Sequence, residues 1–127
     1  MPILVVDDFP LVAAMIAALL RGAGLGDVEI AHSGREASEK LGRRPYDLVI
    51  SDLKMPEMSG VDLFLAIAGS DLAAKPRFKI VTGDKDPANL ADLRGSGVDA
   101  VLEKPLTSAG LRAAIEAIFS GSPARAA

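Results

Sequence analysis

The chain has 127 residues, half of them hydrophobic, with a formal net charge of −3 and no cysteine. This length fits one domain with its own core, and the lack of cysteine excludes disulfides and thiolate metal sites. Because Lys and Arg form no cluster and the longest uncharged stretch, residues 9–20, is too short to span a bilayer, we expect a soluble cytoplasmic protein that binds neither nucleic acid nor membrane.

Strand-like and helix-like segments alternate along the chain. We predict strands at residues 2–6, 27–31, 46–51, 77–82 and 98–102, and helices at 10–22, 34–42, 59–69, 87–95 and 107–119. Five strand–helix units with short connections predict a doubly wound α/β fold, in which a parallel sheet lies between two layers of helices. Residues 1–120 are expected to form the domain and residues 121–127 a flexible tail.

The predicted strands differ in their charged residues. The runs at 3–6 and 48–50 are apolar and do not alternate, which favours central positions in a parallel sheet. The strands at 27–31 and 98–102 carry acids, which edge strands tolerate. The strand at 77–82 alternates, and we expect the charges of Arg77 and Lys79 to lie at its exposed starting end.

Three acids follow the two apolar strands. Asp7 and Asp8 come directly after Val6, and Asp52 closes the run 48–50. Because parallel neighbours end at the same edge of a sheet, we expect these carboxylates to converge and to repel one another. A hard cation with oxygen ligands relieves such repulsion, and Mg²⁺ binds through one or two carboxylates together with phosphate oxygens. The sequence therefore predicts a Mg²⁺-dependent phosphoryl site.

Further motifs close the remaining strands. Thr82-Gly83 ends the fourth strand, Lys104-Pro105 ends the fifth, and a longer run follows the third: Asp52-Leu53-Lys54-Met55-Pro56-Glu57-Met58-Ser59-Gly60. Together with Val5-Val6-Asp7-Asp8-Phe9, these motifs resemble the receiver domain of bacterial response regulators, above all the chemotaxis-type single-domain members, over residues 2–119. The resemblance implies a flavodoxin-like (βα)5 fold with strand order 2-1-3-4-5.

The resemblance also implies roles for the matched residues. Asp52 would accept the phosphoryl group, while Asp8, Asp52 and the backbone carbonyl of Lys54 would bind Mg²⁺, or Mn²⁺ in its place, and Asp7 would act mainly through water. The phosphoryl group would be bound by Thr82, beside the space that Gly83 leaves, and by Lys104. The Lys104-Pro105 bond matches one that is usually cis in the family and would orient the lysine.

The implied function is that of a stand-alone response regulator in a two-component phosphorelay. The chain would take its phosphoryl group from a histidine kinase or a histidine phosphotransfer protein, and would catalyse only its own phosphorylation and dephosphorylation. As a monomer or weak dimer, it would signal through contact with an output protein or act as a phosphate sink. The alternatives are an aspartyl-phosphate phosphohydrolase, whose Asp-x-Asp motif Lys54 interrupts, and a degenerate receiver, which would lack one of the residues above.

Three positions raise separate hypotheses. Val101 stands where the family usually has Tyr or Phe, so the output would not use an aromatic switch; the alternative is that valine simply packs beneath a helix. Lys54 and Asp84 occupy positions that tune phosphoryl hydrolysis in the family, and they either pair across the pocket mouth or remain solvated. An exposed ion pair of this kind contributes only about 0.2–1 kcal/mol, so it would slow loss of the phosphoryl group only slightly.

The helix at 10–22 has an unusually apolar surface, with no charge before Arg21. With Ile16 and its neighbours turned inward, the opposite stripe consists of Leu11, Ala14, Met15, Ala18 and Gly22. We expect this stripe to dock a partner, since the corresponding helix docks the kinase or phosphotransfer bundle in the family; the alternative is an apolar surface without a partner. A similar stripe at Gly110, Ala113 and Ala117 suggests an output or dimer face. His32, the single histidine, is interpreted as a solvated loop residue rather than a metal ligand or phosphohistidine.

Overall fold

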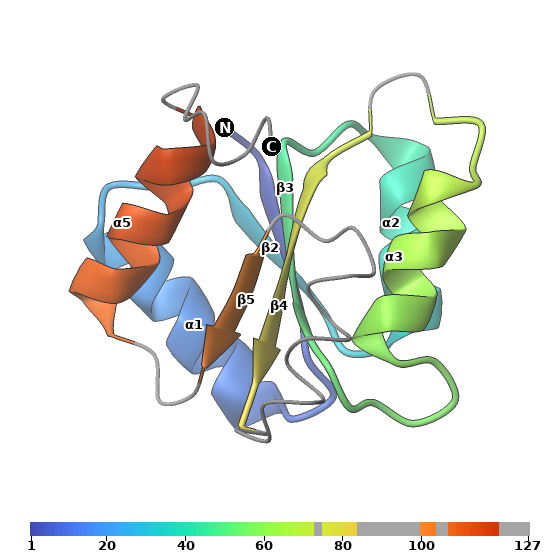
Figure 1. Cartoon of the computed structure of the whole chain (residues 1–127), viewed down its shortest axis with the longest axis horizontal. Coiled ribbons are helices and arrows are strands. Elements are labelled where there is room, and N and C mark those ends of the chain that lie inside the picture. The colour runs from blue at the N-terminus through green and yellow to red at the C-terminus, as the bar shows by residue number, and fades with distance from the viewer. Residues whose placement is uncertain (73–74, 84–99, 104–106, 120–127) are drawn as a thin grey trace.

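The computed structural model describes residues 1–72, 75–83, 100–103 and 107–119 (Figure 1). Its elements are, in chain order, β1 (Ile3–Val6), α1 (Pro10–Gly22), β2 (Val28–Ala31), α2 (Gly34–Arg43), β3 (Leu48–Asp52), α3 (Gly60–Ala68), β4 (Arg77–Thr82), β5 (Ala100–Glu103) and α5 (Ser108–Phe119). These bounds lie within about two residues of the predicted ones. The helix that we predict at 87–95 and the tail at 121–127 lie outside the described residues.

The five strands form one parallel sheet in the order β2-β1-β3-β4-β5. Helices α1 and α5 cover one face of this sheet, and α2 and α3 cover the other (Figure 1). The predicted α/β class, three-layer architecture and strand order are therefore confirmed. The two apolar runs are interior strands, as predicted, because only there are both faces covered by helices.

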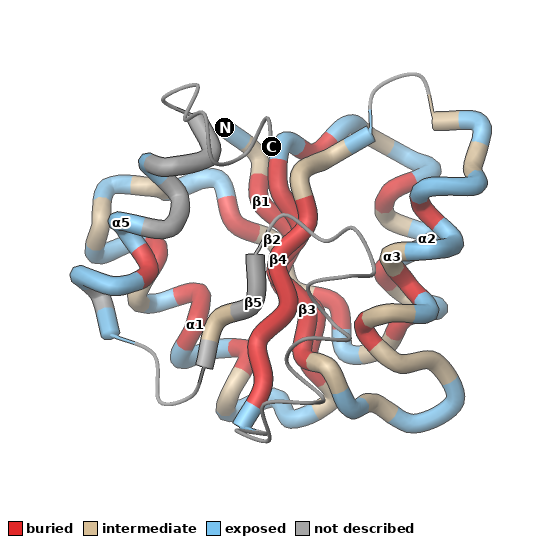
Figure 2. Tube along the Cα trace, in the orientation of Figure 1, coloured by how far each residue is buried: buried red, intermediate tan, exposed pale blue. Residues whose placement is uncertain are grey.

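The core is divided by the sheet into two layers. Successive strand residues point to opposite faces, so Ile3 and Val5 pack with α1 while Leu4 and Val6 pack with α2 and α3. Figure 2 shows the buried residues concentrated along the central strands, with exposed positions on the outer helix surfaces. This double burial explains why β1 and β3 need continuous apolar sequence.

Strand β4 corrects one expectation. Lys79 does not lie at an exposed starting end but is only 2% exposed, aligned with Ile50 on β3 and with Ala100 on β5. The reason is topological, because β4 has a neighbouring strand on each side and its third residue lies well inside the sheet. Arg77, the first residue of β4, is half-buried.

The open edge of the sheet at β2 is covered by two cationic side chains. Its outward carbonyls at Val28 and Ile30 accept hydrogen bonds from Arg21 at 3.3 Å and from Lys40 at 2.8 Å. These donors come from α1 and α2, so both helix layers contribute to the cover. Occupied carbonyls and positive charges at this edge disfavour pairing with another strand.

A polar cluster joins β2 to the loop that precedes β3. Arg44 makes ion pairs with Asp27 at 3.2 Å and with Glu29 at 3.1 Å, and its guanidinium lies 5.0 Å from the centre of the Tyr46 ring. The Tyr46 hydroxyl donates a hydrogen bond to Glu29. Burial of the Tyr46 ring and its bond to the Glu29 carboxylate raise the pKa of Tyr46 from 10.0 to about 12.

We predict that Tyr46 ionises only near pH 12 in the folded protein. Because its folded pKa lies above the unfolded value of 10.0, the stability it contributes is complete below pH 10 and is lost as the pH rises toward 12. Tyr46 is the only tyrosine and the chain has no tryptophan, so tyrosinate absorbance follows this residue alone.

The control is Tyr46→Phe, whose free energy of unfolding should fall less than that of the wild type between pH 10 and pH 12. A titration midpoint near pH 10 in the folded wild type would contradict the cluster.

Candidate functional site

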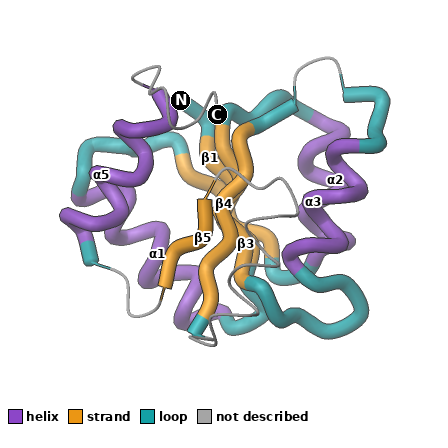
Figure 3. Tube along the Cα trace, in the orientation of Figure 1, coloured by secondary structure: helices purple, strands orange, loops and turns teal. Residues whose placement is uncertain are grey.

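The three acids meet at one edge of the sheet. Asp7 and Asp8 follow β1, and Asp52 is the last residue of the neighbouring strand β3, where Val6 is aligned with Ser51. One carboxylate oxygen from each acid lies within 4.8 Å of the other two. Figure 3 shows the loops that follow β1 and β3 leaving the sheet at this same edge. The predicted convergence of Asp7, Asp8 and Asp52 is thus present.

Burial makes this acidic cluster costly. Asp7 is fully buried, Asp52 is 7% exposed and Asp8 is half-buried. Asp7 Oδ1 accepts a hydrogen bond of 3.0 Å from the Phe9 backbone N–H, which turns the chain into α1. Asp8 Oδ1 is buried and has no hydrogen-bond partner among the described residues. A buried carboxylate oxygen in that condition carries a desolvation penalty that a bound cation would remove.

The donor set fits a hard divalent cation. All three side chains offer oxygen, and the three oxygens lie within 4.8 Å of one another, with no sulfur or imidazole in the cluster that the described residues form. Oxygen-only sites of this kind suit Mg²⁺ or Mn²⁺ rather than zinc. The geometry of the cluster therefore matches the predicted metal site.

Strand β3 holds Asp52 through its backbone. The Asp52 carbonyl accepts a 2.9 Å hydrogen bond from the buried Ser51 hydroxyl, and the Leu53 N–H donates to Val81 at 3.0 Å. The chain then returns so closely that a Cβ on Gly60 would lie 2.5 Å from the Asp52 carbonyl oxygen. Gly60 also donates its N–H to Leu53 at 2.8 Å, which closes the loop from residue 54 to residue 59 against the strand.

Thr82 ends β4 at the same edge as the acids. It is 3% exposed, and the residue before it, Val81, is aligned with Asp52. Gly83 is exposed, and a Cβ placed there would meet no atom of the described residues within 4 Å. Lys104, Pro105 and Asp84 lie outside the described residues; the backbone of β5 ends at Glu103, aligned with Thr82.

The remaining predicted residues lie at the surface. Lys54 is exposed in the loop that follows Asp52. On α1, Leu11 is 80% exposed and Met15 is 56% exposed. The other members of the stripe are also exposed: Ala14, Ala18 and Gly22. On α5, Gly110 and Ala113 are exposed as well, while the side chain of Ala117 is not described.

The sequence interpretation did not anticipate one contact near the site. His32 is exposed and lies in a loop, as predicted, but its Nδ1 lies 3.3 Å from the backbone oxygen of Asp7. The signal available in the sequence was its position directly after β2, a strand predicted to neighbour the strand that carries Asp7. A single histidine without a pattern of ligands around it gave no reason to use that signal.

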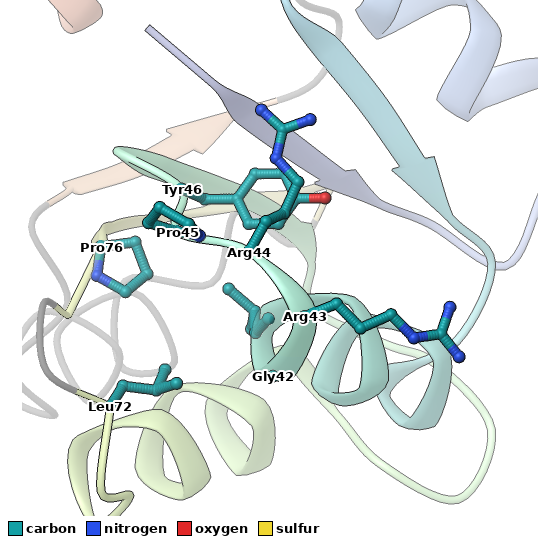
Figure 4. Close-up of a pocket in the computed structure, with 8 residues that line it drawn as sticks. Gly42, Arg43, Arg44, Pro45, Tyr46, Leu72 and Pro76 are labelled. Carbon is teal, nitrogen blue, oxygen red and sulfur yellow. The ribbon is translucent and has the colours of Figure 1, made fainter.

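A separate cavity of about 350 Å³ lies at the opposite ends of the strands (Figure 4). It is formed by the end of α2 and by the segments that lead into β3 and β4, with Pro45, Leu72 and Pro76 in its wall. It contains none of the predicted site residues. In the part of the chain that the structure describes, no helix is long and apolar enough to cross a bilayer.

Comparisons with known proteins bear on the acidic site. A family model of the response regulator receiver domain matches residues 3–116. The chain is 32% identical to a probable chemotaxis protein CheY of Rhizobium etli, covering 92% of this chain and 91% of the relative. It is 31% identical to the chemotaxis protein CheY of Pseudomonas aeruginosa, covering 94% and 96%.

Solved structures agree with these matches. A response regulator receiver domain protein from Clostridium thermocellum superposes with a TM-score of 0.82 at 30% identity, covering 94% of both chains. The chemotaxis protein CheY4 of Vibrio cholerae superposes with a TM-score of 0.83 at 27% identity, covering 93% of this chain and 98% of the other.

We predict that Gly60→Ala destabilises the protein by disturbing the end of strand β3. Its new methyl group would overlap the Asp52 carbonyl oxygen, so the free energy of unfolding should fall by about 1–3 kcal/mol, a typical cost of overpacking. Denaturant unfolding measures this change.

The matched control is Gly42→Ala on α2, where a Cβ would meet no atom within 4 Å in the part of the chain that the structure describes. That substitution should raise stability by up to about 1 kcal/mol, since alanine favours the helix. Equal stabilities of the two variants would disprove the close approach at Gly60.

Proposed function

The chain belongs to the response regulator receiver domains of two-component signalling, and on that premise we propose that Asp52 is its phosphoacceptor. The observation that carries this proposal is the convergence of Asp7, Asp8 and Asp52, with Thr82 ending the adjacent strand at the same edge. Asp52 lies at the centre of this arrangement, on the interior strand β3 between β1 and β4.

The proposed reaction transfers a phosphoryl group from a phosphohistidine to Asp52. A carboxylate oxygen of Asp52 attacks phosphorus, the new P–O bond forms as the donor's P–N bond breaks, and the imidazole leaves with a proton. A bound Mg²⁺ supplies compensation for the charge on the phosphoryl oxygens. The signal ends when water attacks the aspartyl phosphate and releases inorganic phosphate. The protein thus catalyses only its own phosphorylation and dephosphorylation.

Each residue of the site has a proposed part. Asp8, Asp52 and the backbone carbonyl of Lys54 bind the cation directly, and Asp7 acts through water. Thr82 donates its hydroxyl to a phosphoryl oxygen in the space beside Gly83, and Lys104 pairs with another oxygen, oriented by Pro105. Lys54 and Asp84 are proposed to flank the path of the attacking water and so to tune hydrolysis.

We propose that the apolar stripe on α1 docks the donor protein. The helix begins at Pro10, only two residues after Asp8, so its exposed Leu11 and Met15 lie on the element that leaves the phosphoryl site. Exposed apolar side chains that lie together on one surface mark interaction sites more often than single scattered ones do. A histidine kinase or histidine phosphotransfer protein bound there would bring its phosphohistidine to Asp52.

The output is proposed to be contact with a further protein, or withdrawal of phosphoryl groups as a sink. With Val101 in place of an aromatic residue, we propose that loop movement or the bound phosphoryl group itself carries the signal. We place this exchange in the cytoplasm, where ATP regenerates phosphohistidine donors, and propose that the protein acts as a monomer or weak dimer.

Phosphorylation by a small acyl phosphate tests the proposal without the unknown donor. With Mg²⁺ present, we expect the wild type to gain one phosphoryl group, observed by intact-protein mass spectrometry. Asp52→Asn should show no gain, because the amide is not a nucleophile toward phosphorus, and removal of Mg²⁺ with a chelator should abolish the gain in the wild type.

Asp47→Asn is the matched control. Asp47 is exposed at the opposite end of β3, so the same change there should leave phosphorylation intact. Phosphorylation of Asp52→Asn at the wild-type level would move the acceptor to another residue.

A further inference from the structure

The end of the β1–β2 ladder contains an unusual contact. The two strands pair in parallel from Ile3 and Val28 to Val6 and Ala31, and the Asp7 N–H then donates to the Ala31 carbonyl at 3.1 Å. In a parallel ladder the Asp7 carbonyl would next accept from the N–H of residue 33. Residue 33 is instead the N-cap of α2, so the chain has left the sheet by that point.

The side chain of His32 takes the place of that backbone donor. Its Nδ1 lies 3.3 Å from the Asp7 carbonyl oxygen. A carbonyl oxygen only accepts, so the contact is a hydrogen bond when Nδ1 carries the proton. The Asp7 backbone is therefore bound on both sides of its Cα, at its N–H by the Ala31 carbonyl and at its carbonyl by His32.

The position of His32 is itself fixed by the start of α2. Its backbone N–H donates to Glu36 Oε1 at 3.0 Å, and the Glu36 carboxylate lies 3.6 Å from Lys40 Nζ. The Ser33 hydroxyl accepts from the Glu36 N–H at 3.0 Å, which caps the helix. The backbone of His32 is therefore held in place by the first turn of α2. From that fixed backbone the ring reaches the Asp7 carbonyl.

The carbonyl that His32 contacts belongs to the peptide that joins Asp7 to Asp8. Rotation of that peptide plane would swing the Asp8 backbone, and with it the buried Asp8 Oδ1 that has no hydrogen-bond partner among the described residues. We propose that His32 is a positioning residue, whose Nδ1–H fixes the Asp7–Asp8 peptide so that both carboxylates are directed at the divalent cation. The inference rests on the proposed function and extends it.

The test compares Mg²⁺ binding by four proteins in calorimetric titrations: wild type, His32→Ala, His32→Phe and His32→Asn. Phenylalanine keeps a ring without a donor, whereas asparagine keeps an N–H donor at the same number of bonds from the backbone. Loss of one hydrogen bond should weaken Mg²⁺ binding by about two- to tenfold in the Ala and Phe variants, and Asn should restore wild-type affinity.

Two controls separate positioning from a general loss of structure. The melting temperature without Mg²⁺ should lie well above the titration temperature for all four proteins, so that each is folded when Mg²⁺ is added. Ser38→Ala, an exposed change on α2, should bind Mg²⁺ as the wild type does. Equal affinity for Mg²⁺ in the wild type and all three His32 variants would overturn the inference. It would also be overturned if His32→Asn bound as weakly as His32→Ala.

Failure of the proposed function has a different signature. If the wild type bound no Mg²⁺, the proposed metal site would be wrong. The hydrogen bond from His32 to the Asp7 carbonyl would still be tested by the Asp8 amide resonance of the Mg²⁺-free protein. That resonance should shift in His32→Phe and return toward the wild-type position in His32→Asn. An unchanged resonance in His32→Phe would overturn the inference by itself.

Discussion

Electrostatic repulsion among Asp7, Asp8 and Asp52 is the constraint on which the site depends. Two like charges about 4 Å apart cost about 1 kcal/mol in bulk water and about 4 kcal/mol at the effective dielectric of a protein surface. Here one oxygen from each acid lies within 4.8 Å of the others, and Asp7 is fully buried. The sheet tolerates this repulsion because β1 and β3 are anchored by apolar side chains on both faces. A bound cation would relieve the repulsion, and this relief favours cation binding.

Asp7 and Asp52 are anchored mainly by contacts to their backbone atoms. Asp52 is held at its carbonyl by Ser51 and by the close return of Gly60, and the backbone N–H and carbonyl of Asp7 are held by Ala31 and His32. These backbone bonds do not use the carboxylate oxygens, and Asp8 Oδ1 has no hydrogen-bond partner among the described residues. The strands thus fix where the backbones of the acids lie, at the edge where we propose that a cation and a phosphoryl group bind.

The sequence was sufficient for the sheet and for the acidic cluster, and for a physical reason. Uncharged β-branched runs are stable only where helices cover both faces, so Ile3–Val6 and the strand before Asp52 could be placed in the centre, with their acids at one edge. The position of Lys79 was predicted wrongly, because alternation along one strand does not reveal how far its neighbours extend on either side.

Contacts between distant segments were the part that the sequence did not reveal. The Arg44–Tyr46 cluster with Glu29 and the His32 contact with Asp7 join residues 15 to 25 positions apart. No local periodicity encodes them, since they arise from strand register and from where the chain turns into α2. Lys104 and Pro105 lie outside the described residues, so their place at the site remains a sequence-based prediction.

The central claim is that one cation binds between Asp8 and Asp52 and that a phosphoryl group is accepted on Asp52. The most direct measurement is a diffraction structure with Mn²⁺ and beryllofluoride, a mimic of aspartyl phosphate, using the anomalous signal of manganese. The account predicts one manganese peak in contact with both carboxylates and beryllium bonded to an Asp52 oxygen. A manganese peak elsewhere, or beryllofluoride bound to another residue, would contradict it.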